Sequence, residues 1–280
     1  MIIGAHLSIA KGMPVAIDQA QSIGANAFQF FTRNPRGGKA RDIPVEEMEE
    51  FQTYRISAGI KYVVGHMPYT INLATNRPDI HRFGMVTLLE DLRRFNEAGV
   101  EHLVLHPGSH LGDGPEAGIV RIAEALTYVF DNYQGQTRLL LETMAGQGTE
   151  IGSSFDELEA IFRALDWPDE MGLGLDSCHL FAAGYDITTD EGLDRIVDLI
   201  DKKLGWHRVG MMHLNDSKQG LGSGSDRHEK IGQGMIGLDG IATIINHPVF
   251  GDLPFVLETP VKDYSEYGEE IQVVRQLRKL

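Results

Sequence analysis

The chain has 280 residues, of which 42% are hydrophobic and 23% charged, values typical of a soluble globular protein with one sizeable core. Its only cysteine, Cys178, excludes an internal disulfide framework, and the lack of a secretory-signal or membrane-span pattern predicts a cytoplasmic protein. The formal net charge of −15 argues against a nucleic-acid partner, unless many of the carboxylates hold divalent metal ions in one cleft.

Short apolar segments recur along the chain and alternate with longer amphipathic ones. Eight of them are predicted strands, apolar on both faces as helix-covered strands must be: Ile2–Ala5, Ala27–Phe31, Tyr62–Gly65, Leu103–Leu105, Leu139–Leu141, Gly172–Leu175, Val209–Met212 and Phe255–Leu257. Helices are predicted between them, for example over Ile119–Phe130 and over Phe155–Leu165, where Ser154 and Glu157 form a capping-box pattern.

This alternation indicates βαβ units and a parallel sheet. Eight such units in 280 residues predict an α/β fold, a (β/α)8 TIM barrel that forms one domain over residues 1–280. An open, doubly wound sheet is the alternative.

The third to the eighth predicted strands are each followed directly by a histidine or a carboxylate. In chain order these residues are His66, His106, Glu142, Asp176, His213 and Glu258. Active sites of TIM barrels lie at the C-terminal ends of the strands, so we expect these side chains to share one pocket. One such residue alone would be interpreted as a helix cap or a solvated loop residue, but six in register are not explained in that way.

Three imidazoles and three carboxylates suit zinc, manganese or ferrous iron better than magnesium or calcium. Glu142, flanked along the barrel by other candidate ligands, could bridge two metal ions that bind a phosphate and activate water. His179, three residues after a strand-end aspartate, makes a plausible third site with Asp226 and His228 from a Gly- and Ser-rich loop. Cys178 is a possible thiolate ligand, but we favour its interpretation as a small apolar neighbour packed under the site.

Five segments resemble the endonuclease IV family. They are HPGSH at His106–His110, ETMAGQG at Glu142–Gly148, LDSCHLFAAGYD at Leu175–Asp186, MHLND at Met212–Asp216 and DRHEKIGQGMIG at Asp226–Gly237. The resemblance extends from GAHLS at Gly4–Ser8 to LET at Leu257–Thr259, nearly the whole chain. It implies a nuclease of base excision repair that holds three zinc ions. The ligand types themselves also fit manganese at one or more of these sites.

The resemblance implies nine metal ligands, and every one of these positions is filled in this sequence. For the first zinc ion they are His66, His106 and Glu142. For the second they are Glu142 as a bridge, Asp176, His213 and Glu258. For the third they are His179, Asp226 and His228. The implied reaction is attack of a metal-activated hydroxide on the phosphodiester 5′ to an abasic site, which leaves a 3′-hydroxyl and a 5′-deoxyribose phosphate. Glu142 and Glu258 are the implied catalytic residues, with Glu258 orienting the nucleophile.

Two further segments match the DNA-binding loops of this family, FFTRNPR at Phe30–Arg36 and PYTINL at Pro68–Leu73. The resemblance implies that the baseless nucleotide is flipped out of the duplex and that Arg36 and Tyr69 fill the gap. The implied partner is therefore double-stranded DNA with abasic sites, bound by a monomer without a membrane partner. The sequence does not distinguish two roles for His110, which either orients a metal ligand through a hydrogen bond or is an ordinary loop residue.

Two other classes of function are weighed against this one. A sugar isomerase or epimerase of the xylose isomerase type is also a barrel with two metal ions. Such an isomerase does not require a third group of metal ligands like His179, Asp226 and His228. It would also need a lysine for proton or hydride transfer, and no predicted strand here ends in one. A non-catalytic binder of damaged DNA should have lost a ligand, and none of the nine is missing. An ultraviolet-damage endonuclease would match less of the motif pattern. His6 has no predicted role in the site.

Overall fold

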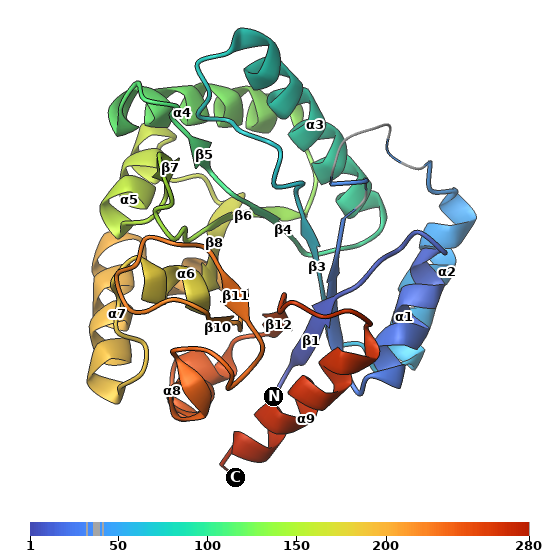
Figure 1. Cartoon of the computed structure of the whole chain (residues 1–280). Helices are drawn as coiled ribbons and strands as arrows, with labels where there is room; N and C mark the ends of the chain where they lie inside the picture. Colours follow the sequence, from blue (N-terminus) through green and yellow to red (C-terminus); the bar gives the residue numbers. More distant parts are fainter. Residues whose placement is uncertain (32, 36–39, 41, 280) are drawn as a thin grey trace.

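The computed structural model describes residues 1–31, 33–35, 40 and 42–279. Eight parallel strands close into a barrel in the order β1-β12-β9-β8-β6-β4-β3-β2 (Figure 1). Their bounds are β1 Ile3–His6, β2 Ala27–Phe30, β3 Tyr62–His66, β4 His102–Leu105, β6 Arg138–Glu142, β8 Met171–Asp176, β9 Val209–His213 and β12 Phe255–Leu257. Each predicted strand is present to within about one residue at either end, so the predicted TIM barrel is confirmed and the open sheet is wrong.

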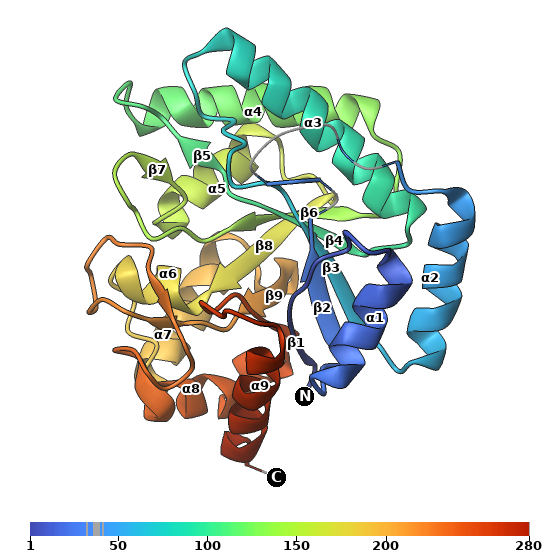
Figure 2. The same ribbon diagram turned by 45° about the vertical axis from the view of Figure 1, so that its right-hand side comes forward.

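Helices surround the barrel on the outside, as Figures 1 and 2 show from two directions. They are α1 Met13–Ser22, α2 Val45–Ser57, α3 Pro78–Glu97, α4 Pro115–Asn132, α5 Phe155–Ala164, α7 Asp190–Lys203, α8 Gly237–Asn246 and α9 Ser265–Leu277. The predicted capping box of α5 is confirmed, with Ser154 Oγ accepting from the Glu157 amide at 3.2 Å. Helix α4 begins earlier than predicted because Pro115 occupies its first turn, where proline is favourable.

The side chains inside the barrel form layers, because successive residues of a strand point alternately inward and outward. One buried layer is apolar and includes Val64, Val104, Leu140, Met211 and Val256. The residue two positions further along each of these strands also points inward, at the C-terminal mouth of the barrel. The strand periodicity therefore directs five of the six strand-end candidates into the mouth.

Gly65 allows α3 to lie close against β3 just before the first strand-end histidine. A Cβ atom at this position would lie 2.1 Å from Cε1 of Phe95, a distance that no side chain tolerates. We therefore expect that any larger residue here would displace the ring of Phe95 or the end of β3.

Shorter elements lie around the C-terminal mouth of the barrel. Two small antiparallel sheets pair β5 Gly108–Ser109 with β7 Glu150–Ile151, and β10 Asp216–Ser217 with β11 His228–Glu229. A short helix, α6 Ser177–Ala182, follows β8, and two 3-10 turns cover Trp206–Arg208 and Phe250–Asp252. Within the described part of the chain, the helices are all too short or too polar to traverse a lipid bilayer.

Candidate metal centre

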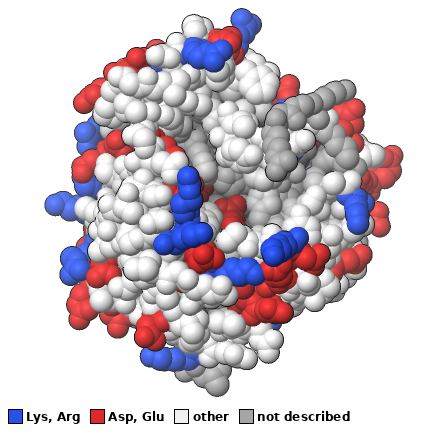
Figure 3. Space-filling model, viewed as in Figure 1, with Lys and Arg blue, Asp and Glu red and all other residues white. Residues whose placement is uncertain are grey.

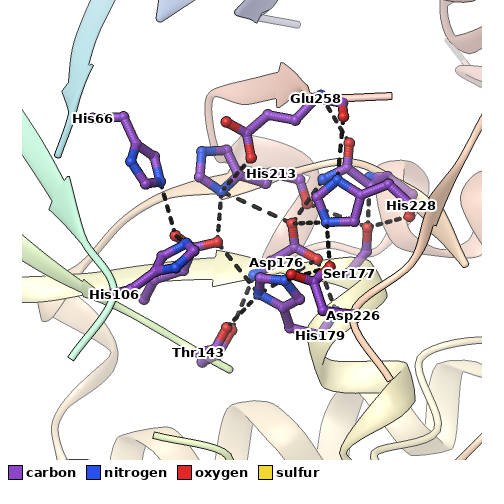
Figure 4. Close-up of polar contacts among 12 residues, drawn as sticks. His66, His106, Thr143, Asp176, Ser177, His179, His213, Asp226, His228 and Glu258 are labelled. Atoms are coloured by element: carbon purple, nitrogen blue, oxygen red, sulfur yellow. Dashed lines mark hydrogen bonds and ion pairs between the residues drawn. The ribbon is translucent and has the colours of Figure 1, made fainter. Parts of the chain in front are cut away.

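All nine predicted ligands lie together at the mouth of the barrel (Figure 4). The prediction placed six of them after their strands. In the structure, four are instead the last residue of a strand: His66, Glu142, Asp176 and His213. Their backbones still take part in the strand pairing, which extends these strands by one residue. His106 and Glu258 directly follow β4 and β12, as predicted.

Glu142 is the centre of the cluster. Its side chain is fully buried, and four imidazole nitrogens surround its two oxygens. Nε2 of His66 and Nε2 of His106 lie 3.1 and 3.0 Å from Oε2. Nδ1 of His213 and Nδ1 of His179 lie 3.0 and 3.4 Å from Oε1. A carboxylate with both oxygens facing different nitrogen donors has the arrangement needed to bridge two cations.

Asp176 connects this group to the rest of the site. Its Oδ1 caps α6 by accepting from the backbone amide of His179 at 2.8 Å. Its Oδ2 accepts from the side-chain amide of Asn215 at 2.7 Å and lies 3.6 Å from Nε2 of His228. The same oxygen lies 3.9 Å from Nδ1 of His213. Asp176 is thus held rigidly between two groups of histidines.

A third group of donors consists of His179, Asp226 and His228. Oδ1 of Asp226 lies 3.2 Å from Nε2 of His179 and 3.3 Å from Nε2 of His228. Both of these nitrogens are buried. They lie within ion-pair distance of Asp226, but neither has the geometry of a hydrogen bond to any residue that the structure describes. Buried polar atoms without partners are rare in native proteins and commonly indicate an ion or water that completes the site.

Asp216, at the start of the loop that carries Asp226 and His228, forms hydrogen bonds with the end of the same loop. This carboxylate is fully buried, and its oxygens accept from the backbone amides of Gly234 at 3.0 Å and Ile236 at 2.9 Å. The loop therefore returns to the barrel at a fixed point, which brings two residues remote from any barrel strand to the metal centre.

Hydrogen bonds on the outer side of the histidines determine which nitrogen faces the cluster. Nδ1 of His66 lies 2.6 Å from the Met67 carbonyl, and Nδ1 of His179 lies 2.8 Å from the Thr143 carbonyl. A carbonyl only accepts, so these Nδ1 atoms carry the hydrogen and the lone pair is on Nε2, which faces the carboxylates. Such outer acceptors are typical of metal-binding histidines. The donor set therefore fits divalent metal ions that accept nitrogen and carboxylate oxygen.

The charges of the cluster are strongly coupled when only protons occupy it. Burial alone would lower the pKa of His213, but the carboxylates of Glu258 and Glu142 outweigh it and raise this pKa to about 9. Burial is likewise outweighed at Glu142 and Glu258, where the surrounding imidazoles hold the carboxyl pKa well below its ordinary value. At Asp226 the pKa falls to about 2, because His179 outweighs the effect of burial. In the metal-free protein, imidazolium protons therefore occupy the space that cations would take.

These shifts predict different pH dependences of stability for the metal-free and the metal-loaded protein. The raised pKa of His213 stabilises the metal-free fold below about pH 6.5, and this contribution is lost as the pH rises through about 9. The lowered pKa values of Glu142 and Glu258 stabilise it above about pH 4.5, and this contribution is lost in acid. The thermal midpoint of the metal-free protein should thus decline from pH 6.5 to 9. Metal requires deprotonated ligands, so the loaded protein should not show this decline. Parallel pH profiles of the two forms in thermal melts would contradict the assignment.

The remaining predicted residues lie around the cluster. Tyr69 is 56% exposed and lines a cavity of about 120 Å³ together with His106. Thr70 donates to the carbonyl of Pro35 at 3.1 Å and so joins the two loops that the sequence assigns to DNA. Arg36 lies outside the described residues.

Two residues left open by the sequence have clear local roles. Nδ1 of His110 accepts from the backbone amides of Gly112 and Gly114 at 3.2 and 3.0 Å, so His110 stabilises its own loop. Cys178 is fully buried, and burial together with Asp176 raises the pKa of its thiol to about 12. A protonated, buried thiol agrees with its interpretation as a packing neighbour of the site.

The sequence analysis missed two residues of the cluster, His6 and Gln29. Nδ1 of His6 lies 3.1 Å from Oε1 of Glu258. Gln29 is fully buried, with its side-chain nitrogen 2.5 Å from the same Oε1 and its side-chain oxygen 2.8 Å from Nε2 of His213. The signal that could have found them is a polar residue at an inward position of an otherwise apolar strand.

Comparison with known proteins places this chain in a family. The Xylose isomerase-like TIM barrel family matches residues 17–277. The chain is 46% identical to the probable endonuclease 4 of Moorella thermoacetica and to that of Heliobacterium modesticaldum, in both cases over 100% of either chain. The crystal structure of endonuclease IV from Thermus thermophilus superimposes with a TM-score of 0.85 and 33% identity, covering 99% of this chain and 98% of that one. A 3-keto-D-glucoside 4-epimerase from E. coli, 12% identical, covers 99% of both chains with a TM-score of 0.69 and shares the fold alone.

Proposed function

Because the chain belongs to the endonuclease IV family of xylose isomerase-like TIM barrels, we propose that it cuts double-stranded DNA on the 5′ side of abasic sites. Within this family it is a metal-dependent nuclease of DNA repair. The cut would leave a 3′-hydroxyl and a 5′-deoxyribose phosphate. We further propose that the protein is a monomer, that residues 1–280 form a single domain, and that it acts on its DNA substrate in the cytoplasm.

The observation that carries the proposal is the third donor group. His179, Asp226 and His228 converge beside the Glu142 cluster, with two buried nitrogens that have no hydrogen-bond partner among the described residues. A sugar isomerase with two metal ions does not require this group. A site for three cations in one pocket suits a substrate that gains negative charge during reaction, as a phosphodiester does.

We infer three zinc ions per chain, with manganese as an alternative at one or more of them. The residues that would hold them are His66, His106 and Glu142 for the first, Glu142, Asp176, His213 and Glu258 for the second, and His179, Asp226 and His228 for the third. When bound, zinc supplies Lewis-acid charge for the phosphate and lowers the pKa of water toward about 7.

Glu258 is the carboxylate we assign to the attacking water. Its side chain is 18% exposed, whereas those of Glu142 and Asp176 are fully buried, so among the carboxylates of the first two metal sites it is the one that the solvent side of the pocket can reach. Its Oε1 is engaged by Gln29 and lies beside His6. Oε2 is then the atom that can accept a hydrogen from water and orient it toward phosphorus. The lowered pKa of Glu258 keeps this carboxylate deprotonated at neutral pH.

The distribution of charge around the mouth supports a nucleic-acid substrate despite the net charge of −15. Figure 3 shows a hollow with acidic side chains at its floor and with Lys and Arg side chains, interspersed with acidic ones, along its lower rim. Two basic residues of the loop that carries Asp226 and His228 are exposed, namely Lys218 and Arg227. Cations that neutralise the acidic floor would leave this rim free to contact phosphates, the usual partners of Lys and Arg in DNA complexes.

The test is incision of a labelled duplex that contains one abasic-site analogue. We expect cleavage on its 5′ side by protein that contains about three zinc ions per chain, loss of cleavage after prolonged chelation, and recovery when zinc is returned. An identical duplex without the abasic analogue is the control substrate. Failure of the fully metallated protein to cut would reject the proposal, and ketose and aldose substrates would then be assayed.

Tyr69→Ala should reduce the preference for abasic over intact duplex while leaving the zinc content unchanged. Tyr69 is exposed at the mouth, where an aromatic ring could stack in the gap left by the missing base. Stacking of this kind is worth about 1–3 kcal/mol, so the preference should fall roughly 10- to 100-fold. Tyr128→Ala removes a tyrosine that is 41% exposed on the outer helix α4 and serves as the matched control. Loss of zinc with unchanged selectivity would show that Tyr69 has a structural role instead.

A further inference from the structure

We propose that Gln29 is a positioning residue that fixes the tautomer of His213 and the orientation of Glu258, so that both face the same metal ion. This inference rests on the proposed function, because it concerns the second of the three inferred zinc sites. It adds a residue outside the nine ligands, from a strand that supplies none of them.

The side chain of Gln29 lies inside the barrel on β2 and is fully buried. Its Oε1 is 2.8 Å from Nε2 of His213. Its Nε2 is 2.5 Å from Oε1 of Glu258 and 2.9 Å from Nδ1 of His6. A primary amide offers an acceptor at one atom and two donors at the other, so one side chain can connect a histidine to a carboxylate.

The carboxylate of Glu258 determines which way the amide points. If the amide were turned over, its oxygen would take the nitrogen's place, 2.5 Å from the carboxylate oxygen of Glu258, and two acceptors would repel each other. The amide nitrogen therefore faces Glu258, and the amide oxygen faces His213.

This orientation in turn determines the tautomer of His213. Because the amide oxygen only accepts, Nε2 of His213 carries the hydrogen and the lone pair is on Nδ1. Nδ1 lies 3.0 Å from Oε1 of Glu142 and 3.6 Å from Oε2 of Glu258. The metal-facing nitrogen of His213 is thus Nδ1, whereas it is Nε2 in His66, His179 and His228.

The outer partner of His213 also differs in kind. His66, His179 and His228 direct their outer nitrogen at the backbone carbonyls of Met67, Thr143 and Glu258, which no substitution removes. The outer acceptor of His213 belongs to a side chain and can be deleted. Loss of such an outer partner typically lowers metal affinity or activity about 10- to 100-fold.

The experiment compares zinc-loaded wild type with Gln29→Met and Gln52→Met. Methionine nearly matches glutamine in length but makes neither hydrogen bond, so a role in packing alone would survive the change. Gln52, half-buried on α2, donates to the carbonyl of Glu97 at 2.9 Å and provides the same substitution outside the barrel. The readouts are zinc release to a chelator, zinc content after dialysis, and the separate effects on kcat and KM for abasic duplex.

For Gln29→Met we expect one of the three zinc ions to be released roughly 10- to 100-fold faster than in Gln52→Met, with the other two retained. We also expect kcat to fall while KM changes little, because the DNA-contacting surface is untouched. Equal zinc release from the two variants would overturn the inference. If instead the wild type binds no zinc or does not cut, the proposed function itself fails.

Gln29→Glu separates the two contacts and covers the case in which Gln29→Met does not fold. Glutamate keeps an oxygen acceptor opposite Nε2 of His213 but places a second carboxylate against Glu258. Gln29→Glu should release zinc about tenfold more slowly than Gln29→Met. If Gln29→Met is unfolded, the comparison is with the wild type, and the zinc-release rate of Gln29→Glu should lie within about threefold of the wild-type rate. Its kcat should still be reduced, because Glu258 loses its donor. Unchanged kcat together with unchanged zinc release in Gln29→Glu would contradict the role assigned to the amide.

Discussion

Replacement of Glu258 by glutamine is expected to lower the rate of incision at an abasic site roughly 10²- to 10⁴-fold while the fold is retained. The substitution keeps the size of the side chain but removes its negative charge. Glu258 is the most exposed carboxylate of the first two inferred metal sites, and its Oε2 is the atom we assign to the attacking water. An amide accepts a hydrogen bond more weakly and is a poorer metal ligand, so both the orientation of the water and the second zinc site are weakened.

The control for this change is Glu101→Gln. Glu101 lies just before β4, at the opposite end of the barrel, where it pairs with Arg55 at 3.0 Å. Its side chain is 46% exposed, and such surface pairs contribute little to stability. Both variants should show the same far-ultraviolet circular dichroism, and Glu101→Gln should cut like the wild type. Wild-type turnover by Glu258→Gln would remove Glu258 from the mechanism.

The barrel could be predicted from sequence because its periodicities are local. Each barrel strand is a short apolar segment between amphipathic helices, and the predicted bounds agree with the structure to within about one residue. Ligands at strand ends, such as His66 and Glu142, were found by the same local pattern. It stays a prediction that these side chains bind metal ions. It also stays a prediction that one domain spans the chain.

Other parts of the site depend on long-range contacts that strand spacing does not reveal. Gln29 occupies an inward position within β2, so a rule based on the residue after a strand overlooks it. His6 does directly follow the first predicted strand, Ile2–Ala5, but one histidine there gives no reason to assign it to the cluster. Asp226 and His228 reach the cluster only because Asp216 fastens their loop through buried backbone hydrogen bonds. The resemblance to a family, not the spacing, suggested that pair as ligands. Arg36 lies outside the described residues, and its insertion into DNA stays a prediction.

The acidity of the chain is less of an objection once the carboxylates are placed. Glu142 and Asp176 are fully buried in the mouth, and Asp226 is held deprotonated beside two histidines. Negative charge that faces inward and is neutralised by cations does not repel a phosphate as surface charge does, because the local field decides the approach of a ligand. Net charge alone therefore misrepresents the face that meets the substrate.

Replacement of Glu142 by glutamine should be still more damaging and should reduce the zinc content from about three ions per chain to about one. Glu142 is the inferred bridge of the first two zinc ions, and four imidazole nitrogens lie within 3.4 Å of its oxygens. The third group, His179, Asp226 and His228, does not include it and should keep its ion. Loss of one partner of a buried ion pair costs about 3–5 kcal/mol, so the metal-free variant should also melt earlier than the metal-free wild type.

Asp226→Asn provides the complementary measurement, because it alters the third group alone. It should lose one zinc ion and retain the two that Glu142 bridges, whereas Glu142→Gln should lose those two and retain the third. Metal analysis after identical dialysis distinguishes the two patterns without reference to activity. If Glu142→Gln kept all three ions, the carboxylate would not be a bridge, and His66, His106 and His213 would have to hold their metal ions without it.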